Sequence, residues 1–201
     1  QDFKLIASLQ PRRRLLGPSP CTMSVATLQM WDDGAAPKGN SQDMHSPGML
    51  TRLRSGECYV FEAKDLLGTG AFARVYRGAK EGCGTPVAVK VVDRSKDTIS
   101  CTLGPEAERY REVLKGLSHP YVITYFDIVD NEDNSFDVME LCTGGDFLDF
   151  VLGMKAYTEK DVAGWTEQLL QALEYIHSHS LTHRDIKPEN IRWSNSKKGA
   201  V

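Results

Sequence analysis

Apolar residues, many of them β-branched or aromatic, gather in three short segments between residues 59 and 92. These segments are 59–63, 73–77 and 87–92. The first two flank a stretch that contains Gly68 and Gly70, and the third follows the turn-forming residues 81–86. Segments of this length and composition, bounded by glycine and proline, are typical of β-strands. The pattern therefore predicts three consecutive strands joined by turns.

Two later segments carry apolar residues at helical spacing. A helix is expected from Pro105, a favoured first-turn residue, to about Leu117. A second helix is expected over 158–179, where Thr158 and Asp161 have the spacing of a capping box. The inner face of the first would consist of Tyr110, Val113, Leu114 and Leu117, and the buried stripe of the second of Val162, Trp165, Leu169, Leu173 and Ile176. Core packing explains Trp165 without a cofactor.

Between these helices, segments 121–127 and 136–139 form a predicted hairpin around the polar turn 130–135. That turn lacks the Asp/Asn and Gly positions of a calcium loop, so no metal is assigned to it. Strand-rich segments followed by helix-rich segments indicate an α+β chain of two lobes.

The first 55 residues differ from the rest of the chain. They hold five of the nine prolines and four glycines, without a sustained helical or strand period, and this composition predicts a disordered tail. Seven Lys/Arg against four Asp give the segment a net charge of +3. Residues 3–16 are basic and partly apolar, as in some transit peptides, but a flexible basic tail is the simpler interpretation.

Composition excludes several classes of protein. Of the 201 residues 41% are apolar, which is enough for a sizeable core. Residues 56–201 carry a net charge of −6, and an acidic region of this kind does not suggest nucleic-acid binding. The five cysteines form no C-x-x-C or zinc spacing, so reduced thiols in the cytoplasm or nucleus are expected. No apolar run approaches the roughly 20 residues that span a bilayer.

Three short motifs carry candidate chemistry. Residues 68–75 (GTGAFARV) join two predicted strands, where glycines let backbone amides approach phosphate oxygens. Residues 87–90 (VAVK) put Lys90 on the next strand, where an ammonium can reach the same phosphates. Residues 183–190 (HRDIKPEN) supply an Asp that can accept a hydroxyl proton and an Asn that can hold magnesium.

In this order and spacing, the three motifs resemble those of a eukaryotic protein kinase, from about Tyr59 to the end of the chain. The resemblance implies a kinase-like α+β fold, with a strand-rich N-terminal lobe over about 56–140 and an incomplete helical lobe over 141–201. With Lys187 in it, the loop resembles that of Ser/Thr kinases. Residues 140–146 (ELCTGGD) resemble the corresponding segment of the calcium/calmodulin-dependent kinase group. The implied activity is γ-phosphoryl transfer from ATP to Ser/Thr hydroxyls of a protein or peptide, with Mg²⁺ as metal.

The resemblance also implies roles for individual residues. Asp185 would deprotonate the substrate hydroxyl, Lys187 would neutralise the transferred phosphoryl, and Asn190 would bind Mg²⁺. His183 would be a packed structural histidine, and Met139 would guard the inner pocket. The residues expected to bind ATP are Leu67, Gly68, Gly70, Val75, Ala88, Lys90, Glu140 and Cys142.

Three departures from the family pattern bear on activity. The helix position that should hold the acidic partner of Lys90 is Tyr110, with Glu106 one turn earlier. Arg192 stands where the family has an apolar residue beneath the adenine; its head could turn to solvent, or it could hinder nucleotide binding. The family's Asp-Phe-Gly does not occur before Val201.

Two functional hypotheses follow. The first is that the chain is a fragment of an active Ser/Thr kinase, because Lys90, Asp185, Lys187 and Asn190 are all present. The alternative is a truncated, non-catalytic, kinase-like binding or regulatory module. In either case the apolar stripe of the 158–179 helix lacks expected partners, so the C-terminal half in isolation should be poorly stable.

Overall fold

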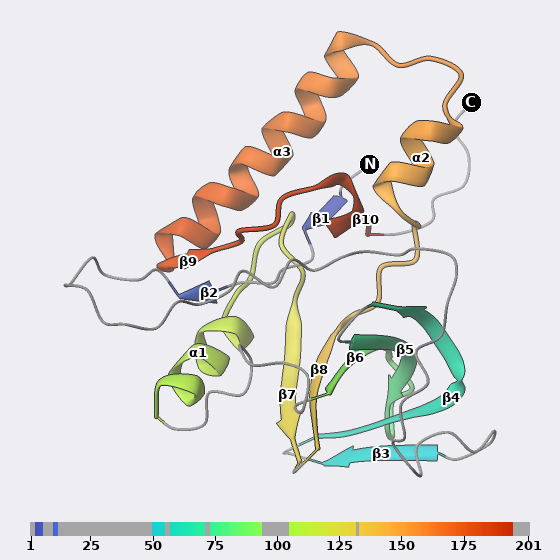
Figure 1. Cartoon of the computed structure of the whole chain (residues 1–201), viewed down its shortest axis with the longest axis vertical. Helices are drawn as coiled ribbons and strands as arrows, with labels where there is room; N and C mark the ends of the chain where they lie inside the picture. The colour runs from blue at the N-terminus through green and yellow to red at the C-terminus, as the bar shows by residue number, and fades with distance from the viewer. Residues whose placement is uncertain are drawn as a thin grey trace. The chain divides into compact units, whose positions relative to one another are not determined.

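The structure is a computed structural model of the chain, and it describes residues 3–5, 10–11, 50–54, 57–70, 73–93, 105–131 and 133–194 (Figure 1). These residues fall into two compact units. The sheet unit takes its described residues from Gln29–Leu117 and Thr124–Leu141. The helical unit takes them from Gln1–Leu28, Ser118–Ile123 and Cys142–Val201.

Six antiparallel strands form the sheet unit, in the spatial order β3-β4-β5-β6-β8-β7 (Figure 1). Their bounds are β3 (Leu50–Arg54), β4 (Cys58–Thr69), β5 (Ala73–Lys80), β6 (Pro86–Asp93), β7 (Tyr125–Asp130) and β8 (Asn134–Glu140). The three strands expected between 59 and 92 are confirmed as β4, β5 and β6, each longer than expected. The predicted hairpin is confirmed as β7 and β8, but β7 begins at Tyr125, and residues 121–123 belong to the helical unit.

One face of this sheet carries its hydrophobic core. Along β6, Val87, Val89 and Val91 all point to that face, as the period of two in a strand requires. They pack with Leu53, Tyr59, Phe61, Tyr76, Phe136 and Val138. The intervening positions of β6, including Lys90, therefore lie on the opposite face, where charged groups can be placed without entering this core.

Helix α1 (Pro105–Lys115) contacts β7. Leu114 and Leu117 are buried, as their helical spacing predicted, whereas Val113 is 37% exposed. The prediction of a four-residue inner face is therefore wrong at Val113. The i+3 position lies at the rim of the buried stripe, whereas Leu114 at i+4 is buried. Leu117 is buried just beyond the end of α1.

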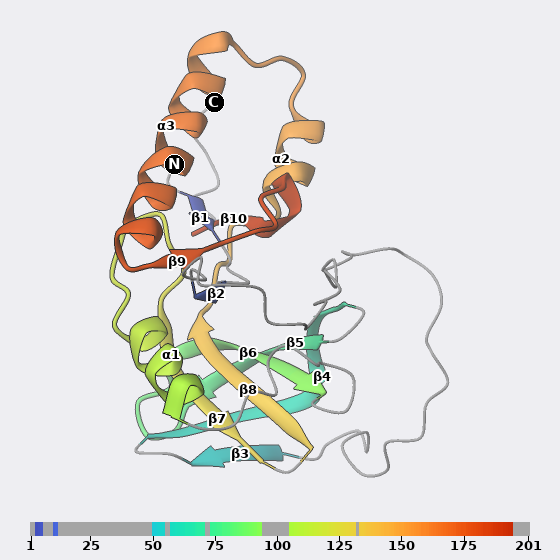
Figure 2. The same ribbon diagram turned by 60° about the vertical axis from the view of Figure 1, so that its left-hand side comes forward.

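The helical unit contains two helices, four short strands and a 3-10 turn. The helices are α2 (Phe147–Gly153) and α3 (Glu159–Ser178), and the turn is η1 (Pro188–Asn190). The strands are β1 (Phe3–Leu5), β2 (Gln10–Pro11), β9 (Leu181–Thr182) and β10 (Ile191–Trp193). β1 pairs with β10 and β2 with β9, both antiparallel (Figure 2). The capping box is confirmed, since the Thr158 side chain accepts from the Asp161 N–H and the Asp161 carboxylate accepts from the Thr158 N–H.

Strand β1 lies in the segment whose composition predicted a disordered tail, so sequence analysis did not predict it. Phe3 is 1% exposed and Leu5 is fully buried. The Phe3 ring contacts those of Tyr121, Phe147 and Trp193 edge-on or tilted. Its N–H donates to Gln168 Oε1 of α3 at 3.3 Å. Two buried apolar side chains and a paired backbone thus tie the N-terminal strand into the helical unit.

The absence of regular structure expected for residues 1–55 is therefore wrong for three described segments, β1, β2 and β3. The physical reason is long-range pairing, since β1 and β2 pair with β10 and β9 and β3 pairs with β4. The rest of that segment lies outside the described residues. Among the described residues, no helix combines the length and hydropathy needed to cross a membrane.

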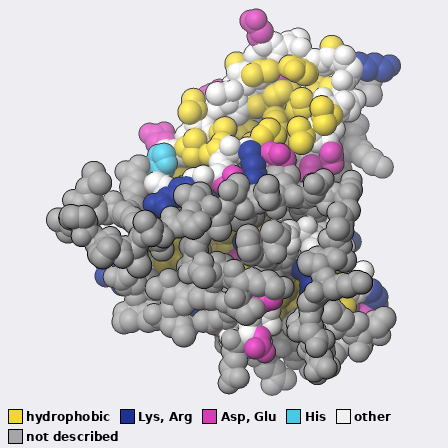
Figure 3. Space-filling view, in the orientation of Figure 1, with side chains coloured by type: hydrophobic (Ala, Val, Ile, Leu, Met, Phe, Trp, Pro, Cys, Tyr) yellow, Lys and Arg dark blue, Asp and Glu magenta, His cyan; other side chains and the backbone are white. Residues whose placement is uncertain are grey.

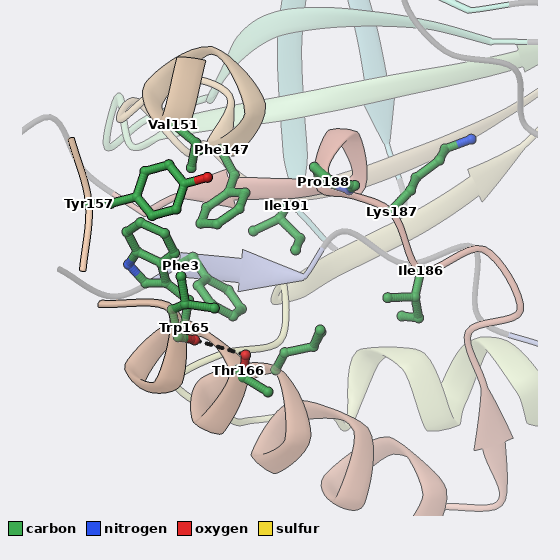
Figure 4. Close-up of a pocket in the computed structure, with 12 residues that line it drawn as sticks. Phe3, Phe147, Val151, Tyr157, Trp165, Thr166, Ile186, Lys187, Pro188 and Ile191 are labelled. Carbon is green, nitrogen blue, oxygen red and sulfur yellow. Dashed lines mark hydrogen bonds between the residues drawn. The ribbon is translucent and has the colours of Figure 1, made fainter. Parts of the chain in front are cut away.

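The apolar stripe of α3 is only partly covered. Ile176 is fully buried and Leu169 and Leu173 are half-buried, but Val162 is 41% exposed. Apolar side chains gather on the surface between α2 and α3 (Figure 3). They surround a pocket of about 370 Å³, whose lining includes Phe147, Tyr157, Trp165, Leu169 and Ile186 (Figure 4). The expected partial exposure is confirmed for Leu169 and Leu173, and it is wrong for Ile176, which is fully buried. Val162 was expected in the buried stripe, and that prediction is wrong.

Candidate active site

Four residues of the sheet unit form one row across neighbouring strands. Gly68 of β4 is paired with Val75 of β5, Val75 with Lys90 of β6, and Lys90 with Asp137 of β8. Directly opposed residues of an antiparallel sheet project from the same face. The sheet register therefore places a glycine, an apolar side chain, an ammonium and a carboxylate side by side on the face opposite the core.

The other expected nucleotide-binding residues of this unit lie close to that row. Ala88 is buried and is paired with Met139; this pair lies two residues along β6 from Lys90. Leu67 is 46% exposed at the end of β4. The Gly70 N–H donates to the Ala73 carbonyl at 2.7 Å, which closes the turn between β4 and β5. With Glu140 at the end of β8, the sheet unit thus contains seven of the eight residues expected to bind ATP.

Lys90 has a carboxylate partner on the sheet. Its Nζ lies 3.9 Å from Asp137 Oδ2, and both side chains are about one-fifth exposed. On α1, Glu108 pairs with Arg111, and Glu112 pairs with Lys115. The side chain of Glu106, the expected substitute partner, lies outside the described residues. Sequence counting along the helix missed Asp137 because that residue is distant in sequence and becomes a neighbour only through the β6–β8 register.

Glu140 and Cys142 follow at the end of β8. The Glu140 N–H donates to the Thr124 carbonyl at 2.9 Å, and its carboxylate accepts from the Thr124 N–H at 2.9 Å. This N–H is therefore not available to a ligand. Cys142 is half-buried and belongs to the helical unit.

The loop between β9 and η1 carries the candidate catalytic residues. Asp185 Oδ2 lies 3.0 Å from Lys187 Nζ and accepts from Asn190 Nδ2 at 2.9 Å. Asn190 Nδ2 also donates to the Asp185 carbonyl at 2.7 Å. Among the described residues, Asp185 Oδ1 has no hydrogen-bond partner. One carboxylate oxygen is thus fixed by two donors, and the other can accept from a hydroxyl.

A buried histidine contacts the backbone of this loop. His183 is 2% exposed, and its Nδ1 accepts from the Asp185 N–H at 3.3 Å. These contacts agree with the structural role expected for His183. Arg184 adopts a φ of 64°, a left-handed conformation that is unfavourable for a residue with a side chain. Such strain persists only where surrounding contacts over-determine the backbone.

Asn190 and Asp185 also provide the oxygens that a magnesium ion prefers. Asn190 donates through Nδ2, so its Oδ1 is available, and within the described part of the chain that atom has no partner. The described residues contain no cluster of three or more His, Cys, Asp or Glu side chains suited to a metal. Mg²⁺ commonly binds through one or two protein oxygens together with phosphates and water. The two side chains fit a site of that shared kind.

Arg192 of β10 forms an ion pair within the helical unit. Its Nη2 lies 3.0 Å from Asp146 Oδ1, and the two side chains are 18% and 23% exposed. Burial raises the pKa of Asp146, and the nearby guanidinium opposes that rise. The head of Arg192 is therefore paired with a half-buried carboxylate. Sequence analysis had considered two other positions for this head, in solvent or in the nucleotide site.

Replacing Arg192 with Leu should destabilise the protein more at pH 7 than at pH 4. Without the cation the pKa of Asp146 rises further, and an acid whose pKa is raised on folding loses stability as pH rises above its unfolded pKa. We expect a loss of about 1–2 kcal/mol at pH 7, measured by urea unfolding at both pH values. Adding Asp146→Asn should recover most of it. An equal loss at both pH values would contradict this account.

Comparisons with known proteins give matches to protein kinases. The model of the protein kinase domain matches residues 61–199. The chain is 33% identical over 154 residues to the serine/threonine-protein kinase cds1 of Schizosaccharomyces pombe, covering 75% of this chain and 34% of the relative. It is 34% identical over 157 residues to a calcium/calmodulin-dependent protein kinase type 1 of Caenorhabditis briggsae, covering 77% and 42%.

Among solved structures, the crystal structure of Rad53 1-466 in complex with AMP-PNP is similar, with a TM-score of 0.56 and 27% identity over 73% of this chain and 38% of that one. The chain belongs to the protein kinase family. Its curated relatives are Ser/Thr kinases and include the calcium/calmodulin-dependent group, as the motifs indicated. The α+β, kinase-like fold is confirmed. The chain spans about 34–42% of the length of the two relatives.

Proposed function

We propose that this protein transfers the γ-phosphoryl group of ATP to Ser/Thr hydroxyls of a protein substrate. The observation that carries the proposal is the catalytic loop, where Lys187 and Asn190 fix one oxygen of Asp185. A carboxylate held in this way can orient a hydroxyl and accept its proton with its second oxygen. Lys187 would also neutralise charge on the transferred group.

Nucleotide binding is proposed for the row that contains Gly68, Val75 and Lys90. A glycine at the strand end leaves space for phosphates near the backbone, and Lys90 supplies a positive charge to them. Ala88 and Leu67 would contact the adenine ring, and Glu140 and Cys142 would offer backbone groups. Since the Glu140 N–H is occupied by Thr124, the contribution of Glu140 would be its carbonyl.

Mg²⁺ is proposed as the metal, held by Asn190 with Asp185 nearby. When bound, such an ion neutralises charge on the ATP phosphates. Lys187 and Asn190 fix the Asp185 carboxylate through their contacts with its Oδ2 atom. We further propose a location in the cytoplasm or nucleus, where the cysteines would stay reduced.

A direct test is phosphoryl transfer from radiolabelled ATP to a pool of Ser/Thr peptides, with the full-length native protein. We expect Lys90→Met to lower transfer by at least about 10-fold and to weaken ATP binding, because the phosphates lose a charged partner. Lys64→Met, which removes an exposed lysine of the same sheet, is the control and should change neither. No transfer by the wild type to any peptide would exclude the proposal.

A second candidate function is a kinase-like module that binds a nucleotide or a partner without catalysis. Tyr110 favours it, because the helix position that would hold the acidic partner of Lys90 carries no carboxylate. The discriminating outcome is ATP binding by the wild type without turnover, together with a partner interaction that survives Asp185→Asn. Turnover that Asp185→Asn abolishes would remove this candidate.

A further inference from the structure

We propose that Asp137 on β8 is the residue that positions Lys90, so that the carboxylate partner of the phosphate-binding lysine comes from the sheet and not from helix α1. This inference rests on the proposed function, because it assigns a role to Asp137 in holding Lys90 for the ATP phosphates. Asp137 pairs with Lys90 and is proposed to act through that lysine, so it is a positioning residue.

The strand register is the first support. Lys90 and Asp137 are directly opposed residues of β6 and β8, and seven consecutive residue pairs run without a shift from Val87↔Glu140 to Asp93↔Asn134. Directly opposed side chains have Cβ atoms about 5 Å apart. The ammonium and carboxylate are 3.9 Å apart, and both are about one-fifth exposed. The backbone ladder alone therefore keeps the two charges adjacent.

The second support is the surroundings of Asp137. Tyr110 of α1 and Tyr125 of β7 lie near enough for the negative charge of Asp137 to raise the pKa of both phenols, in addition to the larger effect of burial. Two neutral aromatic side chains thus border the carboxylate, and Lys90 is its cationic neighbour. A half-buried carboxylate in such surroundings favours an adjacent ammonium.

The third support comes from the helix itself. At the position where the family pattern calls for an acid, α1 carries Tyr110, which is half-buried near Asp137. The described glutamates of α1 are engaged by Arg111 and Lys115 on the same helix. Tyrosine on the helix and aspartate on the strand therefore occur together, as they would if the acid had moved from one element to the other.

This arrangement changes what orders the lysine. A pair between a strand and a helix requires the helix to be docked at the correct angle. A pair between hydrogen-bonded neighbouring strands requires only the register of the sheet, which the pairing of β6 and β8 sets. The orientation of Lys90 for phosphate binding therefore does not depend on the position of α1.

The test compares binding of Mg–ATP and of adenosine to the full-length protein by calorimetry. Adenosine lacks phosphates, so the ratio of the two affinities isolates the phosphate contribution. We expect Asp137→Asn to reduce this ratio about 10-fold and to lower kcat without changing the KM for peptide, because Lys90 loses its fixed orientation. Asp137→Glu keeps the carboxylate and should recover most of the ratio. Asp133→Asn, an exposed charge in the β7–β8 turn, is the control and should leave it unchanged.

A relocation variant separates positioning from packing. Combining Asp137→Leu with Tyr110→Glu returns the acid to the helix, and we expect it to bind ATP better relative to adenosine than Asp137→Leu alone. If Asp137→Asn leaves the ratio unchanged or raises it, Asp137 is neutral or competes with phosphates for Lys90, and the inference is wrong. If the wild type shows no preference for ATP over adenosine, the proposed function fails instead, so the two failures are distinguishable.

Discussion

Replacing Asp185 with Asn is expected to lower phosphoryl transfer to Ser/Thr peptides by about 10²- to 10⁴-fold, the range that a general base contributes. The amide cannot accept the hydroxyl proton, and it also removes the negative charge that Lys187 contacts at 3.0 Å. Initial rates with the full-length protein at saturating ATP measure the effect. Affinity for ATP measured without Mg²⁺ should change little, since the proposed direct ATP contacts lie on other residues.

The matched control is Asp149→Asn, which removes an exposed carboxylate from the first turn of α2 in the same unit. Its transfer rate should remain within about twofold of wild type, as expected for a surface substitution away from the site. If Asp185→Asn retained more than a tenth of the wild-type rate, Asp185 would not be the base. If both variants lost activity equally, the loss would reflect folding of the helical unit and not chemistry.

Replacing Phe3 with Ala is expected to destabilise the protein by about 3–5 kcal/mol, the range for truncating a buried phenylalanine. Phe3 is 1% exposed and contacts three aromatic rings, including Trp193 at a centroid distance of 6.3 Å. Its removal would leave a cavity beside β10, the strand that follows Asn190 directly. Urea unfolding followed by tryptophan fluorescence measures the loss, because Trp193 reports on this region.

Phe126→Ala is the control, since Phe126 is 41% exposed on β7 and should contribute far less. A conservative Phe3→Leu variant, with an expected loss of about 1–2 kcal/mol, keeps the test informative if Phe3→Ala does not fold. Equal losses for Phe3→Ala and Phe126→Ala would mean that β1 does not stabilise the helical unit. A loss of catalytic rate alongside stability would show that β1 also supports the loop that ends at Asn190.

Local sequence was sufficient where an element depends on its own residues. Thr158 and Asp161 predicted the start of α3 because a capping box is completed within four residues of chain. The strands β4, β5 and β6 were predicted because each carries enough apolar and β-branched residues to indicate a strand without knowledge of its neighbour. The candidate catalytic loop was identified for the same reason, since its motif lies within eight consecutive residues.

Prediction failed where an element depends on a distant partner. β1, β2, β9 and β10 have only two or three residues each, too few for a periodic pattern, and they exist because they pair across the chain. Helix α2 was missed because its seven residues are short for a helical pattern. Val113 was misplaced because periodicity gives the direction of a helix face but not the width of its buried part.

By itself, the sequence determined the protein kinase family, the α+β class and the residues proposed to carry the chemistry, because motifs of four to eight residues bring those groups together along the chain. Only the tertiary structure decided which carboxylate faces Lys90, how Arg192 is neutralised and what covers β10. Each of these depends on residues far apart in sequence, such as Lys90 with Asp137 and Phe3 with Trp193. Strand register and side-chain packing make them neighbours, and neither is encoded in a local pattern.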